Sequence, residues 1–288
     1  MSFPPPSGPV VLDGGLSDQL VAQGRDLGDE LWTARLLVEE PEQLLAAHTA
    51  YVRAGARVVI SGSYQASFEG FARRGIGRRA AARLLGDSVR LARASGARWV
   101  AASVGPYGAT LADGSEYRGR YGLSAAELER FHRPRIEALL AAGPDVLALE
   151  TIPDAVEAEA LVRAVRGCGV PAWLSLTVAG AATRAGQPLD EAFGAAAAAD
   201  EVVAVGVNCC APADVLPAVT RATAVTGRPA VAYPNSGAWS RSARRPSSPP
   251  SLPSLAPAWL AAGARLLGGC CGVGPDTIAA MARALPAS

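Results

Sequence analysis

Residues 124–177 read SAAELERFHRPRIEALLAAGPDVLALETIPDAVEAEALVRAVRGCGVPAWLSLT. Within this stretch, Ser124–Ala142 and Asp154–Arg166 have apolar residues at helical spacing. They alternate with two short aliphatic runs, Asp145–Glu150 and Ala172–Thr177, whose near-continuous hydrophobicity is typical of parallel strands buried on both faces. The stretch therefore predicts two consecutive helix–strand units.

The same alternation extends outward in both directions and gives eight predicted strands in all. They are Val10–Asp13, Arg57–Ser61, Trp99–Val104, Asp145–Glu150, Ala172–Thr177, Val202–Asn208, Ala230–Tyr233 and Ala264–Gly268. Eight strands that alternate with helices predict an α/β fold, a (β/α)8 TIM barrel formed as a single domain by residues 1–288. A doubly wound sheet is the alternative. An irregular loop insertion, rich in Ser, Pro and Arg, is expected at about residues 236–257.

Local signals mark the ends of several predicted helices. Ser124 followed by Glu127 predicts a capping box, and Pro41 and Pro275 fit first-turn positions. A glycine stands between helix and strand in five places, where it is the residue expected at a helix C-terminus. These glycines are Gly55, Gly96, Gly143, Gly167 and Gly263.

The composition excludes several classes of protein. The formal net charge is +1, and there is no basic stripe with interleaved aromatic residues, so we expect no nucleic-acid partner. No apolar run approaches the roughly 18 residues of a membrane span. Met1–Pro9 lacks the basic and apolar segments of a secretory signal. We therefore expect a cytoplasmic protein with no membrane partner.

Polar and sulfur-bearing residues follow the ends of nearly all the predicted strands. They include Asp13, Ser61, Ser103, Glu150, Thr177, Asn208, Cys209, Tyr233, Asn235, Cys270 and Cys271. The carboxyl ends of barrel strands converge on one mouth. We therefore expect Cys209 to meet the Cys270–Cys271 pair there, close to the two acids Asp13 and Glu150.

Three cysteines at one mouth have two possible roles, metal binding and packing. Thiolates are soft ligands that suit Zn²⁺, and three protein ligands leave a fourth position open, as in catalytic zinc sites. Cysteines near strand ends are also common as small buried hydrophobic residues, which is the role we expect for Cys168 and Cys210. A disulfide is disfavoured in a cytosolic chain. The pattern alone leaves metal binding and packing open for Cys209, Cys270 and Cys271.

Three segments resemble the signature segments of the homocysteine S-methyltransferase family: Asp13–Gly15, Gly206–Cys209 and Gly268–Gly272. Longer stretches resemble the branch that uses S-methylmethionine or S-adenosylmethionine. They are Leu31–Ala34, Ser63–Ala66, Ser103–Gly108, Leu111–Gly119, Phe131–Arg135, Glu150–Thr151 and Tyr233–Gly237. The resemblance covers about Val11 to Leu285. Residues 236–257 depart from it, because they are shortened and lack the expected aromatic and histidine residues.

The resemblance implies a (β/α)8 barrel with one Zn²⁺ per chain. Cys209, Cys270 and Cys271 match the metal ligands of the family and are the expected catalytic residues. Asp13 and Glu150 match acids that lie near the amino group of homocysteine. The implied reaction moves a methyl group from a sulfonium donor, S-methylmethionine or S-adenosylmethionine, to the homocysteine thiolate, giving methionine.

Further substrate contacts are expected around this mouth. Trp32 and Tyr64 are candidates for cation–π contact with the sulfonium. Ser103, Asn208 and Asn235 are candidates because of their places at strand ends. Three loop residues, Tyr107, Glu116 and Tyr117, are candidates for the amino acid part of the donor, and His48 and His132 are expected to be structural.

Two alternative functions remain. One is the same fold with betaine or another methyl donor, or with another thiol acceptor. The other is a non-catalytic zinc or thiol protein, although no fourth protein ligand is placed to complete a structural site. We expect a monomer.

Overall fold

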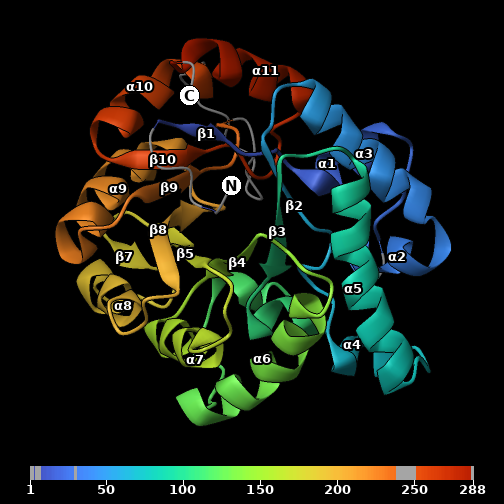
Figure 1. Cartoon of the computed structure of the whole chain (residues 1–288). Coiled ribbons are helices and arrows are strands. Elements are labelled where there is room, and N and C mark those ends of the chain that lie inside the picture. Colours follow the sequence, from blue (N-terminus) through green and yellow to red (C-terminus); the bar gives the residue numbers. More distant parts are fainter. Residues whose placement is uncertain (1–2, 4–7, 29–30, 238–250, 287–288) are drawn as a thin grey trace.

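The computed structural model describes residues 3, 8–28, 31–237 and 251–286. Eight parallel strands form one sheet in the order β1-β10-β9-β8-β5-β4-β3-β2, with helices around its outer face (Figure 1). The strands are β1 (Val10–Val11), β2 (Val58–Ile60), β3 (Trp99–Val104), β4 (Val146–Ile152), β5 (Ala172–Leu176), β8 (Val202–Asn208), β9 (Ala230–Tyr233) and β10 (Ala264–Leu267). The predicted (β/α)8 barrel is therefore confirmed.

The barrel closes where β1 meets β2, through an isolated parallel bridge between Leu12 and Val58. The backbone N–H of Arg57 also donates to the carbonyl of Val11 at 2.8 Å. The bridge residue Leu12 directly precedes Asp13, so this seam lies beside the acid.

The described ranges contain eleven α-helices and three short 3-10 helices. They are α1 (Leu16–Ala22), η1 (Trp32–Arg35), α2 (Leu36–Glu39), α3 (Pro41–Arg53), α4 (Phe68–Arg73), α5 (Arg78–Ala94), η2 (Tyr107–Leu111), η3 (Ser115–Tyr117), α6 (Ala125–Leu140), α7 (Ala155–Val165), α8 (Leu189–Ala196), α9 (Pro212–Thr226), α10 (Leu252–Ala261) and α11 (Pro275–Ala284). Among these described helices, none is long and apolar enough to cross a membrane.

The predicted helix signals are confirmed. Ser124 and Glu127 form the expected capping box at the start of α6. Pro41 and Pro275 lie in the first turns of α3 and α11. A short antiparallel hairpin, β6 (Val178–Ala179) with β7 (Ala182–Thr183), follows β5 and was not predicted.

The irregular segment expected at residues 236–257 ends earlier than predicted. Helix α10 begins at Leu252, so the last six residues of that range are helical. Pro253 lies in the first turn, where its missing N–H would have no helical acceptor. Ala256 and Trp259 bury their side chains one turn later. Residues 238–250 of the predicted loop lie outside the described residues.

Alternation along the strands divides the core into two layers. Val11 packs outward with the helices, while Val10 and Leu12 belong to a separate cluster formed by the interior of the barrel. Phe3 joins this interior cluster, with its ring 6.0 Å from Trp99 and 6.1 Å from Trp173. Both tryptophans lie near the amino ends of their strands. Aromatic side chains therefore fill the end of the barrel opposite the predicted mouth.

We expect Gly206→Ala to destabilise the barrel. A Cβ atom at Gly206 in β8 would lie 2.1 Å from the carbonyl oxygen of Val231 in β9, a backbone contact that cannot relax easily. The expected loss is about 3 kcal/mol, seen as a lower urea midpoint. Gly194→Ala in α8 is the control, because nothing lies within 4 Å of that position. It should be neutral or stabilising by up to about 1 kcal/mol. Equal midpoints for the two variants would contradict the steric argument.

Candidate active site

A pocket opens at the carboxyl ends of the strands. Apart from the three loop candidates for the donor, Tyr107, Glu116 and Tyr117, there are ten predicted site residues. Seven of these ten line the pocket: Asp13, Trp32, Tyr64, Glu150, Cys209, Cys270 and Cys271. The other three, Ser103, Asn208 and Asn235, do not line it and instead hydrogen-bond residues that do. The structure therefore brings the predicted residues together, and it divides them into lining and supporting groups.

Three sulfur atoms lie together in the pocket. The Sγ of Cys209 is 2.7 Å from that of Cys270 and 3.9 Å from that of Cys271, and the latter two are 3.9 Å apart. Hydrogen bonds from Cys270 and Cys271 hold the pKa of the Cys209 thiol well below its usual range. The pKa values of those two thiols are raised, chiefly because each thiol donates a hydrogen bond to Cys209. In the described part of the chain, this trio forms a cluster that could hold a metal ion.

Adjacent cysteines reach one pocket because the chain turns directly after β10. The N–H of Cys270 donates to the carbonyl of Pro234 at 2.7 Å, and that of Cys271 donates to Oδ1 of Asn235 at 3.1 Å. Gly272 has a φ of +75°, which glycine adopts at little cost. Asn235 therefore supports the turn that presents Cys271.

Asp13 is buried at the seam of the barrel. Its Oδ2 accepts the N–H of Ile60 at 2.8 Å, and its Oδ1 accepts the hydroxyl of Tyr233 at 2.9 Å. Burial raises the pKa of Asp13 to about 7, although both hydrogen bonds oppose the rise. A cationic ligand would lower this pKa, because a nearby positive charge favours the ionised form of the acid.

Glu150 is the second buried acid of the pocket. Burial raises its pKa to about 8, and the nearby charges of Cys209 and Asp13 add to the rise. The hydroxyl of Ser103 donates to Oε1 of Glu150 and opposes it. Ser103 thus contacts the acid but does not line the pocket. Two acids with raised pKa values in one pocket form a site suited to an ammonium group.

Thr151, which was not predicted as a site residue, also lines the pocket. Its backbone N–H and its hydroxyl both bind the side chain of Asn208. Thr151 and Cys209 share an unusual property, since each is a non-glycine residue with a left-handed φ, +60° and +50° respectively. No local sequence signal marks either conformation.

Two tyrosines stand beside the sulfur atoms. The hydroxyl of Tyr117, in η3, lies 3.6 Å from Sγ of Cys209 and donates to it. Tyr64 also lines the pocket. Burial, followed by the charge of Cys209, raises the pKa of both phenols, so both remain neutral. Tyr117 was predicted only as a donor contact, and its loop brings it against the thiols.

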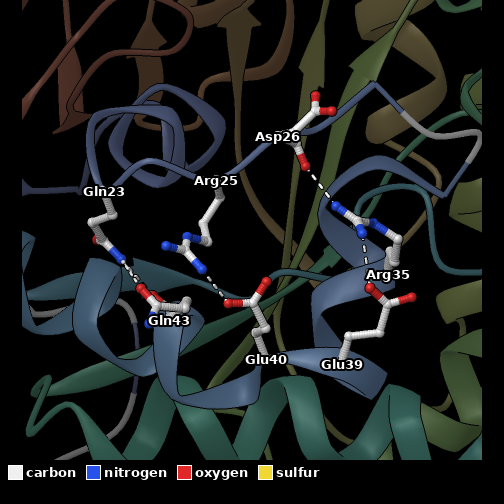
Figure 2. Close-up of polar contacts among 7 residues, drawn as sticks. All are labelled: Gln23, Arg25, Asp26, Arg35, Glu39, Glu40 and Gln43. Carbon is white, nitrogen blue, oxygen red and sulfur yellow. Dashed lines mark hydrogen bonds and ion pairs between the residues drawn. The ribbon is translucent and has the colours of Figure 1, made fainter.

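Polar contacts tie down the segment that carries Trp32. Figure 2 shows Arg25 paired with Glu40, and Arg35 bound both to Glu39 and to the carbonyl of Asp26. In the same view, Gln23, which precedes the segment, donates to Gln43, which follows it. Trp32 begins η1 with a φ of +47°. These contacts join residues that precede Trp32 to residues that follow it, and Trp32 itself lines the pocket.

The remaining cysteines and histidines lie away from the pocket lining. Cys210 packs in the layer between barrel and helices, as predicted. Cys168 is partly buried beyond α7. His48 is buried in α3, and His132 is buried in α6, where Nε2 is 2.9 Å from a carboxylate oxygen of Glu157.

Comparison with known proteins identifies the family. A sequence profile described as homocysteine S-methyltransferase matches residues 10–285. The chain belongs to the homocysteine S-methyltransferase family. The chain is therefore a methyltransferase, and the resemblance seen in the sequence is confirmed.

Relatives in this family match over almost their whole lengths. A homocysteine S-methyltransferase of Escherichia coli K12 is 42% identical, and the match covers 94% of each chain. One from Bacillus subtilis is 40% identical over 96% of this chain and 95% of its own. A crystal structure of the homocysteine methyltransferase MmuM from Escherichia coli, in a metallated form, covers 96% of each chain with a TM-score of 0.87.

We expect Glu150→Gln to stabilise the metal-free protein at high pH. The ordinary pKa near 4.5 rises to about 8 on folding, so the native state keeps a proton that the unfolded chain loses. Stability from this group is complete below pH 4.5 and is lost as pH rises through 8. The variant should therefore raise Tm at pH 8 by about 3 °C or more, with little change at pH 4.5. Calorimetry at both pH values tests this.

The exposed variant Glu191→Gln in α8 serves as the control. A rise in Tm for Glu150→Gln that is equal at both pH values would contradict the assignment to the buried charge.

Proposed function

We propose that this chain is a zinc-dependent homocysteine S-methyltransferase that takes its methyl group from a sulfonium donor. The observation that carries the proposal is the meeting of three thiols and two buried acids in one pocket. Homocysteine has one group for each part of this arrangement, because it carries a thiol at one end and an ammonium group at the other.

The three cysteines fit a zinc ion. Sulfur ligands about 2.3 Å from a tetrahedral metal lie about 3.8 Å apart, and two of the three sulfur separations are 3.9 Å. The Cys209–Cys270 pair, at 2.7 Å, would open by about 1 Å. Zinc held here would supply a Lewis acid that lowers the pKa of the acceptor thiol from its usual value near 8.5. Three protein ligands leave the position that such a thiol needs.

The two acids would bind and orient the acceptor. Asp13 and Glu150 have raised pKa values in the ligand-free pocket, and an ammonium group between them would return both toward the ionised state. The hydrogen bonds from Ile60, Tyr233 and Ser103 hold the carboxyl groups in place. Binding of the ammonium group by both acids would orient the acceptor sulfur toward the donor.

The pocket also suits a cationic donor. Four aromatic residues, Trp32, Tyr64, Tyr117 and Tyr233, line it, and no arginine of the described chain does; the sequence has no lysine. Aromatic faces attract cations, more strongly where water is excluded. In the transfer, the acceptor sulfur bonds the methyl carbon while the bond from that carbon to the donor sulfur breaks. The donor leaves as a neutral thioether, and a buried pocket favours this loss of charge.

The direct test is methionine formation from homocysteine by zinc-loaded protein under reducing conditions. S-methylmethionine, S-adenosylmethionine and betaine are supplied separately, each with and without chelator. Turnover with a sulfonium that the chelator stops would support the proposal. Turnover with betaine alone would assign a different donor. Absence of turnover with all three, with zinc bound, would favour another thiol acceptor or a non-catalytic site.

We expect Cys271→Ser to abolish both zinc binding and turnover. Loss of a direct ligand should exceed the roughly 10- to 100-fold cost in metal affinity of losing an outer-shell partner. Zinc content and competition with a chromophoric chelator measure the effect. Cys210→Ser is the matched control, because Cys210 is buried beside Cys209 but packs away from the pocket. It should keep its zinc. Full activity of zinc-free Cys271→Ser would exclude the mechanism.

We expect Trp32→Ala to weaken donor binding selectively. Loss of one cation–π contact should raise the KM for the sulfonium by roughly 2- to 30-fold. The KM for homocysteine should stay nearly unchanged, because Trp32 is assigned to the donor side. Steady-state kinetics with each substrate varied in turn measures both values. An equal rise in the two KM values would show that Trp32 supports the whole pocket.

A further inference from the structure

Strand β4 carries a bulge at the pocket. Leu149 pairs with Leu174 in β5, and the next pair is Ile152 with Leu176. Glu150 and Thr151 therefore stand opposite the single residue Ser175. A bulge of this kind changes the direction of the side chains that it carries. Both Glu150 and Thr151 line the pocket as a result, whereas neighbours in a regular strand point to opposite faces.

The bulge depends on a backbone conformation that threonine rarely adopts. Thr151 has a φ of +60°, a region unfavourable for β-branched residues. The carboxamide of Asn208 binds it at two points. Oδ1 accepts the Thr151 N–H at 2.6 Å, and Nδ2 donates to Oγ1 of Thr151 at 2.7 Å. Both residues are only 1% exposed, so water does not compete for these bonds.

This pair of hydrogen bonds links two strands that are not neighbours, because β5 lies between β4 and β8. On β4, Thr151 directly follows Glu150. On β8, Asn208 directly precedes Cys209, whose φ is also left-handed at +50°. The carboxamide therefore joins the residue beside the buried acid to the residue beside the sulfur.

We propose that Asn208 and Thr151 are a positioning pair that fixes Glu150 relative to Cys209 and so matches the pocket to an amino acid thiol of the length of homocysteine. The inference rests on the proposed function. Homocysteine has three carbons between its amino nitrogen and its sulfur, whereas cysteine has two. One methylene in a pocket is worth roughly 10- to 200-fold in discrimination, provided that the two ends of the pocket keep their separation.

The test compares three thiols that differ in length or in the amino group. Zinc-loaded wild type and Asn208→Ala are titrated by calorimetry, without donor, with homocysteine, with cysteine and with 4-mercaptobutyrate, which equals homocysteine without its amino group. In the variant we expect the Kd for homocysteine to rise by about tenfold or more, since Glu150 is displaced. The Kd for 4-mercaptobutyrate should change by less than about twofold, and the preference for homocysteine over cysteine should shrink.

A second substitution separates backbone positioning from simple packing. Glycine adopts a positive φ readily, so adding Thr151→Gly to Asn208→Ala should restore part of the homocysteine affinity. Thr151→Val, a milder change that replaces the hydroxyl by a methyl group, should show the same selectivity for the amine if Asn208→Ala does not fold. Thr183→Ala is the control, because Thr183 is a buried threonine with two hydrogen bonds to Gln187, away from the pocket.

The outcomes are distinct. Selective loss of homocysteine affinity, with rescue by glycine, would support the positioning pair. Equal weakening of homocysteine and 4-mercaptobutyrate, or no weakening of either, would overturn it while leaving the proposed function intact. Failure of zinc-loaded wild type to bind homocysteine would instead overturn the proposed function, and the inference with it.

Discussion

The pocket depends on three departures from regular strand geometry. A regular strand sends neighbouring side chains to opposite faces, yet Glu150 and Thr151 both line the pocket, as do Cys270 and Cys271. The bulge in β4 explains the first pair, and the glycine-rich turn after β10 explains the second. The left-handed Cys209 at the end of β8 completes the set. Each of these three irregularities lies where a buried strand reaches the rim, so the rim carries the chemistry.

Much of the fold could be predicted from the sequence because its signals are local and repeated. The aliphatic runs, the capping box at Ser124 and the first-turn prolines each depend on a few adjacent residues, and all appear in the structure. Convergence of the strand ends then brings Cys209 to Cys270 and Cys271 without further information. The hairpin after β5 and the early start of α10 were missed, because the first is too short for a periodic signal and the second begins within a Ser/Pro-rich stretch.

The internal arrangement of the site was harder to predict because it depends on contacts between distant residues. Position at a strand end grouped Ser103, Asn208 and Asn235 with the lining residues, but their side chains bind Glu150, Thr151 and the backbone of Cys271. Nothing in the local sequence distinguishes an amide that faces a ligand from one that binds a neighbouring strand. The roles of the lining residues in binding remain predictions.

Asp13 contributes both to the closure of the barrel and to the pocket. Its side chain binds Ile60 of β2 while its backbone carbonyl accepts the N–H of Gly269 at 3.3 Å, so one residue joins β2 to the segment that follows β10. The same carboxyl group lines the pocket. Evolution therefore cannot tune the charge of this acid independently of the integrity of the barrel. Changes in substrate preference should arise more readily at positions such as Trp32, whose side chain is only partly buried and whose flanking residues are held by the polar contacts in Figure 2.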